Sequence, residues 1–568
     1  MILIAAIGTG RYGEADYYRV AEPARSHRTR YGPVAAAALH EGVQEALLLM
    51  TPEAEQAHGV ALTAELERLG IHSQKLSIPV GRTEREIWEM VRLLMERVPN
   101  DADVVVDVTH ALRHIPVLFL SALTFLTGER KVRVRAIVYG AYEVRDGDRV
   151  PMFDLRPFFT LMEYYHAVRQ FRETGDARRL AEHLKRLNEE LWKQDEGSRD
   201  LSALAQSLSD VGESLMSGLP LETGLHSRRA AIHLQTALSH ISPQYPIGAT
   251  LMQLTRPVLE DYKLRQDVTT KADIVLDLTE LQREWKIIRS ALEAKNYDRV
   301  LLLLREWLIS RCVLAVGPHR WLDYPSCRRQ IEKALNGLVE RVRVNRDSAS
   351  VLQRDLCGVW SKVVELRNAL AHAGMRPEEV ELRKKAHNIE QALQWCEEHC
   401  ELDSAWRLDT APPGERLLIT PLGLSPGVLL TALKPLSDQA GNRALVVTSE
   451  EASRKVPEIC KQAGWDPLHL SIEIVRDPHR GFDDVQGIVK RWQAKLAGCS
   501  EVTVNVTGGT TALQYIVDRL GREAERLGLP VRWIALIDDR PLEQQQREPY
   551  VEGQVYELEA PVSFVQGS

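Results

Sequence analysis

The residues best suited to chemistry lie in the run Arg367-Asn368-Ala369-Leu370-Ala371-His372. On a helix, this spacing places Arg367 and His372 about a turn and a half apart near one end, so that two copies facing each other across a two-fold axis could share one phosphate. A histidine ordinarily titrates near neutrality, so His372 is suited to proton transfer. Arg367 is suited to hold phosphate oxygens and the charge that builds on them in a transition state, and Asn368 is suited to orient either side chain. Together they are suited to chemistry at a phosphate, with one group to hold its oxygens and one to move a proton.

The same Arg-x4-His spacing recurs in residues 178–183 and 228–233, so the bare pattern is weak. Only the third copy has an asparagine directly after its arginine, and residues 363–366 before it continue a helical pattern. The charges of the other two copies are expected to lie on solvated helix faces. The catalytic candidates are therefore Arg367, Asn368 and His372.

Glycine-rich or polar turns follow two strand-like apolar runs near the N-terminus, residues 2–7 and 104–108. In an open parallel sheet, ligands bind beyond the carboxyl ends of the strands, where backbone N–H groups and helix N-termini can hold a phosphate. Tyr12 would add a ring on which a base can stack. The candidate ligand-binding residues of this region are Gly8, Thr9, Gly10, Arg11, Asp107, Thr109, His110 and Arg113.

A distant repeat of this arrangement lies near the C-terminus. The run Val104-Val105-Val106-Asp107-Val108-Thr109-His110 aligns with Val502-Thr503-Val504-Asn505-Val506-Thr507-Gly508. Glycine-rich turns also end many ordinary strands, and Thr109 or Thr510 could simply cap the next helix. The candidate ligand-binding residues of the repeat are Gly423, Ser425, Asn505, Thr507, Gly508, Gly509 and Thr510.

The distribution of apolar runs divides the chain into three predicted domains. Residues 1–155 alternate helical stretches with short branched apolar runs, which are typical of strands buried on both faces of a parallel sheet. Residues 156–408 carry long amphipathic stretches without strand signals, which predicts an all-helical region. Two prolines and a glycine in 409–414 predict a linker, and the alternation returns in 415–568. The expected fold class is α/β plus all-α, with two Rossmann-like parallel-sheet domains flanking the helical domain.

Length and composition predict an ordinary globular protein of two to four domains, with 568 residues, 44% hydrophobic and 27% charged. A net charge of -7 gives no global attraction to a polyanion, so RNA would need a local basic cleft. The seven cysteines predict reduced thiols rather than disulfides or a zinc site. The apolar segments 1–7 and 116–126 are too short for a signal peptide or a membrane span, which predicts a cytoplasmic protein with no membrane contact.

Two of these motifs resemble those of known families. Asp107-Val108-Thr109-His110, followed by Arg113-His114, resembles the Asp-x-Thr-His motif of CRISPR-associated CARF domains, which are Rossmann-like sensors of cyclic oligoadenylates in type III systems. Ala111 stands where members of that family usually carry glycine. The turns at 422–427 and 507–510 are similar to loops of another CARF branch. Residues 367–372 resemble the Arg-x4-His signature of HEPN ribonucleases.

The resemblance implies a type III CRISPR-associated endoribonuclease built as CARF, HEPN and CARF domains. A cyclic oligoadenylate would activate it, and single-stranded RNA would be cut to a 2′,3′-cyclic phosphate and a 5′-hydroxyl. No metal or other cofactor is expected. One strong Arg-x4-His motif per chain implies a homodimer or higher oligomer in which two copies meet at a two-fold axis.

Alternatives from other functional classes stay open at this point. The helical domain could recruit a partner instead of cutting RNA, which would leave a cyclic-oligoadenylate sensor. The second sheet domain could degrade the ligand as a ring nuclease, although its loops offer threonine and serine but no histidine or lysine beside Gly508. A nucleotide-dependent metabolic enzyme is disfavoured: residues 8–13 match the dinucleotide glycine spacing, but Pro23 interrupts the helix that should follow, and 28–31 lack the expected acid.

Overall fold

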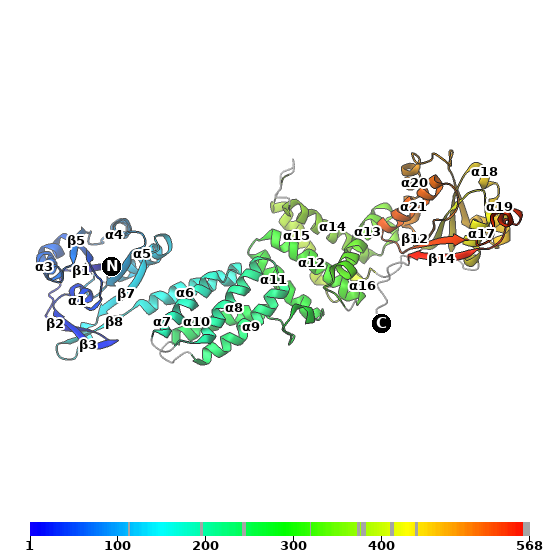
Figure 1. The fold of residues 1–568 in the computed structure, drawn as a ribbon. Coiled ribbons are helices and arrows are strands. Elements are labelled where there is room, and N and C mark those ends of the chain that lie inside the picture. The colour runs from blue at the N-terminus through cyan, green and yellow to red at the C-terminus, as the bar shows by residue number, and fades with distance from the viewer. Residues whose placement is uncertain are drawn as a thin grey trace. The chain divides into compact units, whose positions relative to one another are not determined.

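The structure is a computed structural model that describes residues 1–111, 114–193, 197–240, 246–317, 320–371, 375, 382–408, 414–437 and 441–559. The chain forms two compact units. The first comprises Met1–Arg172, Ala177–Ala205 and His233–Pro257, and the second comprises Glu173–Asp176, Gln206–Ile232 and Val258–Ser568. Each unit contains one β-sheet and a set of helices (Figure 1).

The first unit contains an eight-stranded sheet in the order β3-β2-β8-β7-β6-β1-β4-β5. β1 lies between β4 and β6 and is parallel to both. All of its residues are buried, which explains its unbroken apolar sequence. The strands are β1 (Ile2–Ile7), β2 (Ala15–Arg19), β3 (Glu22–Thr29), β4 (Glu45–Met50), β5 (His72–Ser77), β6 (Asp103–Asp107), β7 (Arg133–Gly140) and β8 (Arg149–Asp154).

Helices cover both faces of this sheet and produce two separate hydrophobic clusters. One cluster packs α1 and α3 against the sheet, and the other packs α4 and α5 against the opposite face. This arrangement is the three-layer solution expected for a sheet that is apolar on both faces. The helices are α1 (Gly32–Leu39), α2 (Pro52–Ala54), α3 (Val60–Arg68), α4 (Glu84–Arg97) and α5 (Ile115–Glu129).

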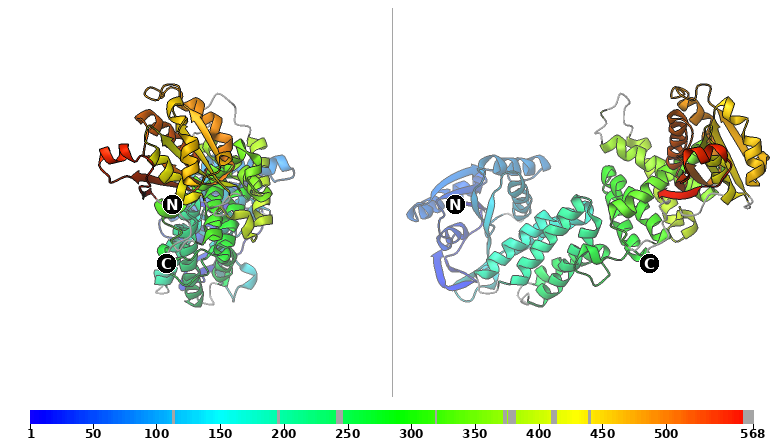
Figure 2. Two further views of the ribbon diagram at one scale, coloured as in Figure 1. Left: turned by 90° about the vertical axis from the view of Figure 1, so that its right-hand side faces the viewer. Right: turned by 45° about the vertical axis from the view of Figure 1, so that its right-hand side comes forward.

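The second unit contains a six-stranded sheet in the order β11-β10-β9-β12-β13-β14. α20 and α21 pack on one face, and α17 and α19 pack on the other (Figure 2). The strands are β9 (Glu415–Leu422), β10 (Asn442–Thr448), β11 (Leu470–Ile474), β12 (Cys499–Asn505), β13 (Val531–Ile537) and β14 (Gln554–Glu559). The helices are α17 (Pro426–Leu433), α18 (Glu450–Ser453), α19 (Val456–Ala463), α20 (Val485–Ala497), α21 (Thr511–Arg526) and α22 (Leu542–Arg547).

Both sheets share one strand order. Numbered from its own first strand, the second sheet runs 3-2-1-4-5-6, the order of a doubly wound fold. The first sheet has the same order once the hairpin of β2 and β3, which extends its edge, is set aside. The switch point therefore lies between β1 and β6 in one sheet and between β9 and β12 in the other.

The prediction of two sheets dominated by parallel strands, together with a helical region, is confirmed. Each sheet also contains antiparallel pairs, namely β2 with β3, β7 with β8, and β13 with β14. Such neighbours need no crossover helix between them. A hairpin also replaces the helix that would follow residues 8–13 in a dinucleotide-binding loop.

The described residues between β8 and β9 form helices and turns only. In the second unit their core contains the fully buried indoles of Trp307, Trp360 and Trp406, each of which donates a hydrogen bond. The helices are α6 (Arg156–Thr174), α7 (Arg178–Trp192), α8 (Arg199–Met216), α9 (Pro220–His240), α10 (Pro246–Tyr262), α11 (Leu278–Glu293), α12 (Tyr297–Val316), α13 (Arg329–Val344), α14 (Val351–Ala371), α15 (Leu382–His399) and α16 (Asp403–Trp406). Within the described part of the chain, none of the helices is both long and apolar enough to cross a bilayer.

We predict that Gly32→Ala destabilises the first unit. A Cβ on Gly32, the first residue of α1, would lie 2.6 Å from Cβ of Thr109, so the new methyl group must displace the β6 loop. Overpacking of this kind costs about 1–3 kcal/mol. Gly128→Ala is the matched control, because Gly128 in α5 has no neighbour within 4 Å and should gain up to about 1 kcal/mol from helix propensity. Urea denaturation of both variants checks this, and equal shifts in the same direction would contradict it.

Candidate functional site

The predicted residues of the first sheet come together at its switch point. Gly8 follows β1, and its N–H donates to the carbonyl oxygen of His110, which follows the neighbouring strand β6, over 3.0 Å. Thr9, Gly10 and Arg11 are exposed beside this contact. The structure therefore places the two predicted loops side by side, whereas Arg113 lies outside the described residues.

Four aromatic or imidazole rings gather around these loops. The ring of Tyr12 lies 3.9 Å from the ring of His110 and 4.9 Å from the ring of His58, centroid to centroid. His58 Nε2 donates to the carbonyl oxygen of Gly10 over 2.9 Å, and its Nδ1 lies 3.4 Å from the Tyr31 hydroxyl. The sequence analysis missed His58 and Tyr31. His58 lies in a π-helical turn, η1 (Glu55–Gly59), soon after β4, and such turns often occur at functional sites.

The cluster contains one atom without a partner. His110 Nε2 is buried and has no hydrogen-bond partner among the described residues. Burial lowers the pKa of His110 to about 4, so the ring is neutral at physiological pH. A neutral imidazole in contact with Tyr12 offers a flat surface on which a nucleobase can stack, and one ring nitrogen without a partner among the described residues.

Asp107, at the end of β6, is a buried acid. Its Oδ1 accepts hydrogen bonds from the Thr109 hydroxyl over 2.6 Å and from the Thr109 N–H over 3.4 Å. Its Oδ2 is buried without a partner among the residues that the structure describes. Burial raises the pKa of Asp107 to about 7, because desolvation disfavours the charged carboxylate.

The predicted residues of the second sheet also meet at the switch point. A Cβ on Gly423, after β9, would lie 2.8 Å from Cα of Gly509, after β12, so the two loops are in backbone contact. Gly508 and Gly509 have φ values of 103° and 69°, which favour glycine. Thr510 caps α21, as the alternative interpretation expected, and its hydroxyl also donates to the carbonyl oxygen of Pro478. Ser425 is exposed at the start of α17.

The same hydrogen-bond arrangement fixes the loops at both switch points. We call the loops after β1 and β6 the first edge, and the loops after β9 and β12 the second edge. The Thr109 hydroxyl accepts the N–H of Gly140 from β7 over 2.9 Å, and the Thr507 hydroxyl accepts the N–H of Leu536 from β13 over 2.9 Å. Asn505 differs from its counterpart Asp107 because its Nδ2 is fully used, donating to the Thr420 hydroxyl and to the Thr507 carbonyl oxygen. The repeat seen in the sequence is therefore also a repeat of contacts.

Groups from other loops reach the second edge and were missed. Lys455 Nζ donates to the carbonyl oxygen of Leu424 over 2.7 Å. Lys455 was not predicted, because it lies between α18 and α19, far in sequence from both loops. The rings of Phe482 and Tyr515 are exposed and lie 5.7 Å apart. No sequence spacing marks these residues, since the fold alone brings them together.

The catalytic candidates lie at the end of α14. Leu366 and Ala369 are buried and hold this end of the helix in the core, while Arg367 and Asn368 between them are partly exposed. Arg367 Nη1 donates to Asn368 Oδ1 over 3.2 Å. His372 directly follows α14 and lies outside the described residues, as do 409–413 of the predicted linker.

One side chain of each of the other two copies has a structural partner. In the first copy, the His183 ring lies 6.3 Å from Tyr164, and burial lowers the pKa of His183. In the second copy, Arg228 contacts Asp267 and the carbonyl oxygen of Gln266. These side chains are therefore occupied by packing or ion pairing.

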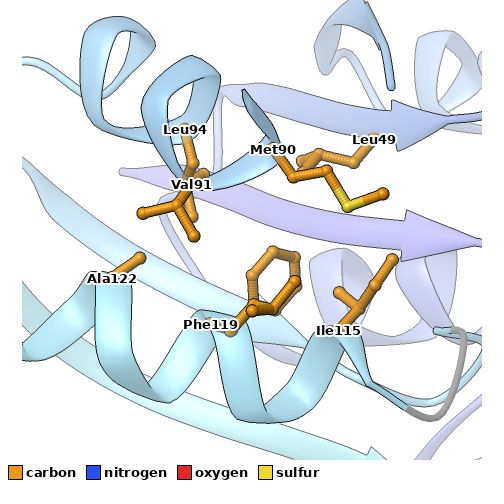
Figure 3. A pocket seen from close by; sticks show the side chains of 8 residues that line it. Leu49, Met90, Val91, Leu94, Ile115, Phe119 and Ala122 are labelled. Atoms are coloured by element: carbon orange, nitrogen blue, oxygen red, sulfur yellow. The ribbon is translucent and has the colours of Figure 1, made fainter. Parts of the chain in front are cut away.

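A small cavity under α4 and α5 does not join either candidate edge. Figure 3 shows its lining, which is entirely apolar and offers no group that could hold a phosphate or a base. The lining residues are Leu49, Met90, Val91, Leu94, Ile115, Leu118, Phe119 and Ala122.

The sequence also has a partial likeness to a known protein. Part of the chain is similar to a CRISPR-associated protein. Over 118 residues it is 30% identical to CRISPR-associated protein MJ1674 of Methanocaldococcus jannaschii. The match covers 20% of this chain and 19% of that relative, so it indicates a relation to CRISPR-associated proteins but carries over no activity. No protein-family model matches the chain.

We predict that Asp107→Asn reduces the loss of stability that the first unit suffers as pH rises. The folded state keeps the Asp107 proton up to about pH 7, whereas an unfolded aspartate loses it near its ordinary pKa of 3.8. Stability should therefore fall with rising pH between those values, by roughly 4 kcal/mol at most. Asparagine has no proton to lose, so this pH-dependent contribution to the free energy of unfolding disappears.

The measurement is urea denaturation of wild type and Asp107→Asn between pH 5 and 8. His110 has the opposite effect on stability: because its pKa is lowered in the folded state, it destabilises the protein as pH falls. The relevant quantity is therefore the difference in free energy of unfolding between the two proteins at each pH. Asn505→Asp is the converse control and should introduce a loss of stability at neutral pH. Parallel pH profiles for wild type and Asp107→Asn would show that Asp107 is ionised in the folded protein.

Proposed function

We propose that this protein is an RNA endonuclease of type III CRISPR defence that a cyclic oligoadenylate switches on. The observation that carries the proposal is the Arg367–Asn368 pair, held at the end of α14 directly before His372. The partial likeness to a CRISPR-associated protein supports the same biological setting.

The two switch points support a ligand with both bases and phosphates. The first edge brings the rings of Tyr12 and His58 together with the neutral ring of His110. The second combines the open backbone of Gly508 and Gly509 with the nearby Lys455 ammonium group. Open α/β sheets bind nucleotides at this place. A cyclic oligoadenylate presents purine rings and phosphodiesters alternately and matches both kinds of group.

The proposed reaction is a transesterification within RNA. The 2′-oxygen attacks the adjacent phosphorus, the bond to the 5′-oxygen breaks, and a 2′,3′-cyclic phosphate and a 5′-hydroxyl result. Arg367 would bind the non-bridging oxygens and stabilise the added charge, and His372 would move the proton. Asn368 accepts a hydrogen bond from Arg367 and so restricts the orientations of the guanidinium.

A single chain supplies one set of these residues. Two chains related by a two-fold axis would supply two sets around one phosphate, so the proposed active form is a homodimer or larger assembly.

A second candidate function has an observation of its own. His58 and His110 flank Tyr12 at the first edge, and a pair of imidazoles can cut an RNA-like phosphodiester by acid–base catalysis. The first sheet would then degrade the cyclic ligand as a ring nuclease, and the helical region would recruit a partner. Consumption of the cyclic ligand by Arg367→Ala and His372→Ala variants would favour this candidate.

We predict that the purified protein cuts a fluorophore–quencher RNA without metal in the presence of one of cyclic tri-, tetra- or hexa-adenylate. Arg367→Ala and His372→Ala should each lower the rate by about 100-fold or more, since they remove charge stabilisation or proton transfer. His233→Ala, from a second copy of the same spacing, is the control and should keep the wild-type rate. Equal rates for His372→Ala and wild type, or 3′-hydroxyl products, would contradict the proposal.

A further inference from the structure

Helix α13 and the end of α21 touch through their backbones. A Cβ on Gly337, in α13, would lie 2.5 Å from Cα and 2.6 Å from N of Gly528, so no side chain fits between them. Gly528 follows α21 with φ of +71°, a conformation that glycine adopts without strain. The pair is therefore a point of close approach between the helical region and the six-stranded sheet, both within the second unit.

Further contacts hold α13 in this position. Arg526 Nη1, near the end of α21, forms an ion pair with Glu340 Oε2 of α13 over 2.7 Å. Val344, at the end of α13, packs against the hydrophobic cluster that α20 and α21 form on the sheet. A partly exposed ion pair adds little stability by itself, but a backbone contact flanked by a salt bridge and an apolar anchor leaves α13 little freedom to slide on α21.

The other end of α21 starts at the candidate ligand loop. Thr510 caps the first turn, and Gly528 lies just beyond the last, so one helix of 16 residues joins the loop to the α13 contact. A helix of this length spans about 24 Å. A displacement of residues 507–510 by a bound ligand would therefore be carried along α21 to Gly528.

From α13 the contacts continue to the catalytic candidates. Asn336, adjacent to Gly337, accepts a hydrogen bond from the indole N–H of Trp360 in α14 over 2.9 Å. Trp360 is fully buried, so its position is tied to that of α13. Arg367 lies on the same helix about two turns further on. A shift of α13 therefore moves the end of α14 that presents Arg367.

We propose that Gly337 and Gly528 are positioning residues that transmit ligand binding at residues 507–510 to the Arg367–Asn368 pair. The six-stranded sheet is then the sensor that controls cleavage. This inference rests on the proposed function and adds to it the identity of the controlling sheet and the route of control.

The test compares Gly337→Ala with Gly358→Ala in the full-length protein. Gly358 lies in α14 with no neighbour within 4 Å, so its substitution adds a methyl group without a clash. The activation ratio, which is the cleavage rate with the activating cyclic oligoadenylate divided by the rate without it, should fall about tenfold or more in Gly337→Ala. It should stay at the wild-type value in Gly358→Ala. The affinity of each variant for the cyclic oligoadenylate should stay within about twofold of wild type.

A binding measurement separates transmission from a merely structural role. Coupling is reciprocal, so a non-cleavable 2′-O-methyl RNA should tighten cyclic oligoadenylate binding in wild type but not in Gly337→Ala. Glu340→Gln, which removes the ion pairs of Glu340 with Arg526 and with the exposed Arg343, should fold normally and lower the activation ratio a few-fold.

Two failures can be told apart. If wild type is activated and Gly337→Ala keeps both the wild-type activation ratio and the RNA effect on binding, this inference is overturned while the proposed function stands. If no cyclic oligoadenylate activates wild type, the proposed function fails and the inference fails with it.

Discussion

A threonine hydroxyl holds each candidate ligand edge. The threonine lies two residues beyond an acid or an amide at the end of a strand. Thr109 and Thr507 both accept an N–H from the next strand, so the loop at the switch point is fixed to the sheet on its far side. Each such bond contributes only about 1 kcal/mol, but it keeps the loop in one conformation before a ligand arrives, which lowers the ordering cost of binding. In both sheets the other predicted loop then lies against it, through Gly8 and His110 or through Gly423 and Gly509.

Much of the fold could be predicted from sequence where burial dictates composition. Ile2–Ile7 has the bounds that its branched apolar run predicted, because a strand buried on both faces needs such residues. The hairpin of Ala15–Arg19 and Glu22–Thr29 was not predicted, since its second strand is largely exposed and polar. Edge strands of this kind take their conformation from neighbours rather than from their own pattern.

The site was predictable only as far as it is local in sequence. The loops after central strands were found because glycine and Asp-x-Thr spacing marks them. His58, Lys455 and the Phe482–Tyr515 pair were missed, because tertiary structure alone brings these groups to the loops. The difference between Asp107 and Asn505 could likewise not be read from the alignment, since it depends on whether the neighbouring strand supplies a hydroxyl, as Thr420 does for Asn505.

The central claim is that the edges held by these threonines bind a cyclic oligoadenylate. Isothermal titration of the metal-free, full-length protein with cyclic tri-, tetra- and hexa-adenylate, each paired with the linear oligoadenylate of the same length, tests it most directly. The account predicts saturable binding of one ring size and much weaker binding of its linear counterpart, since the fixed edges favour a closed ligand. Absence of binding for every ring, by protein that circular dichroism shows to be folded, would contradict it.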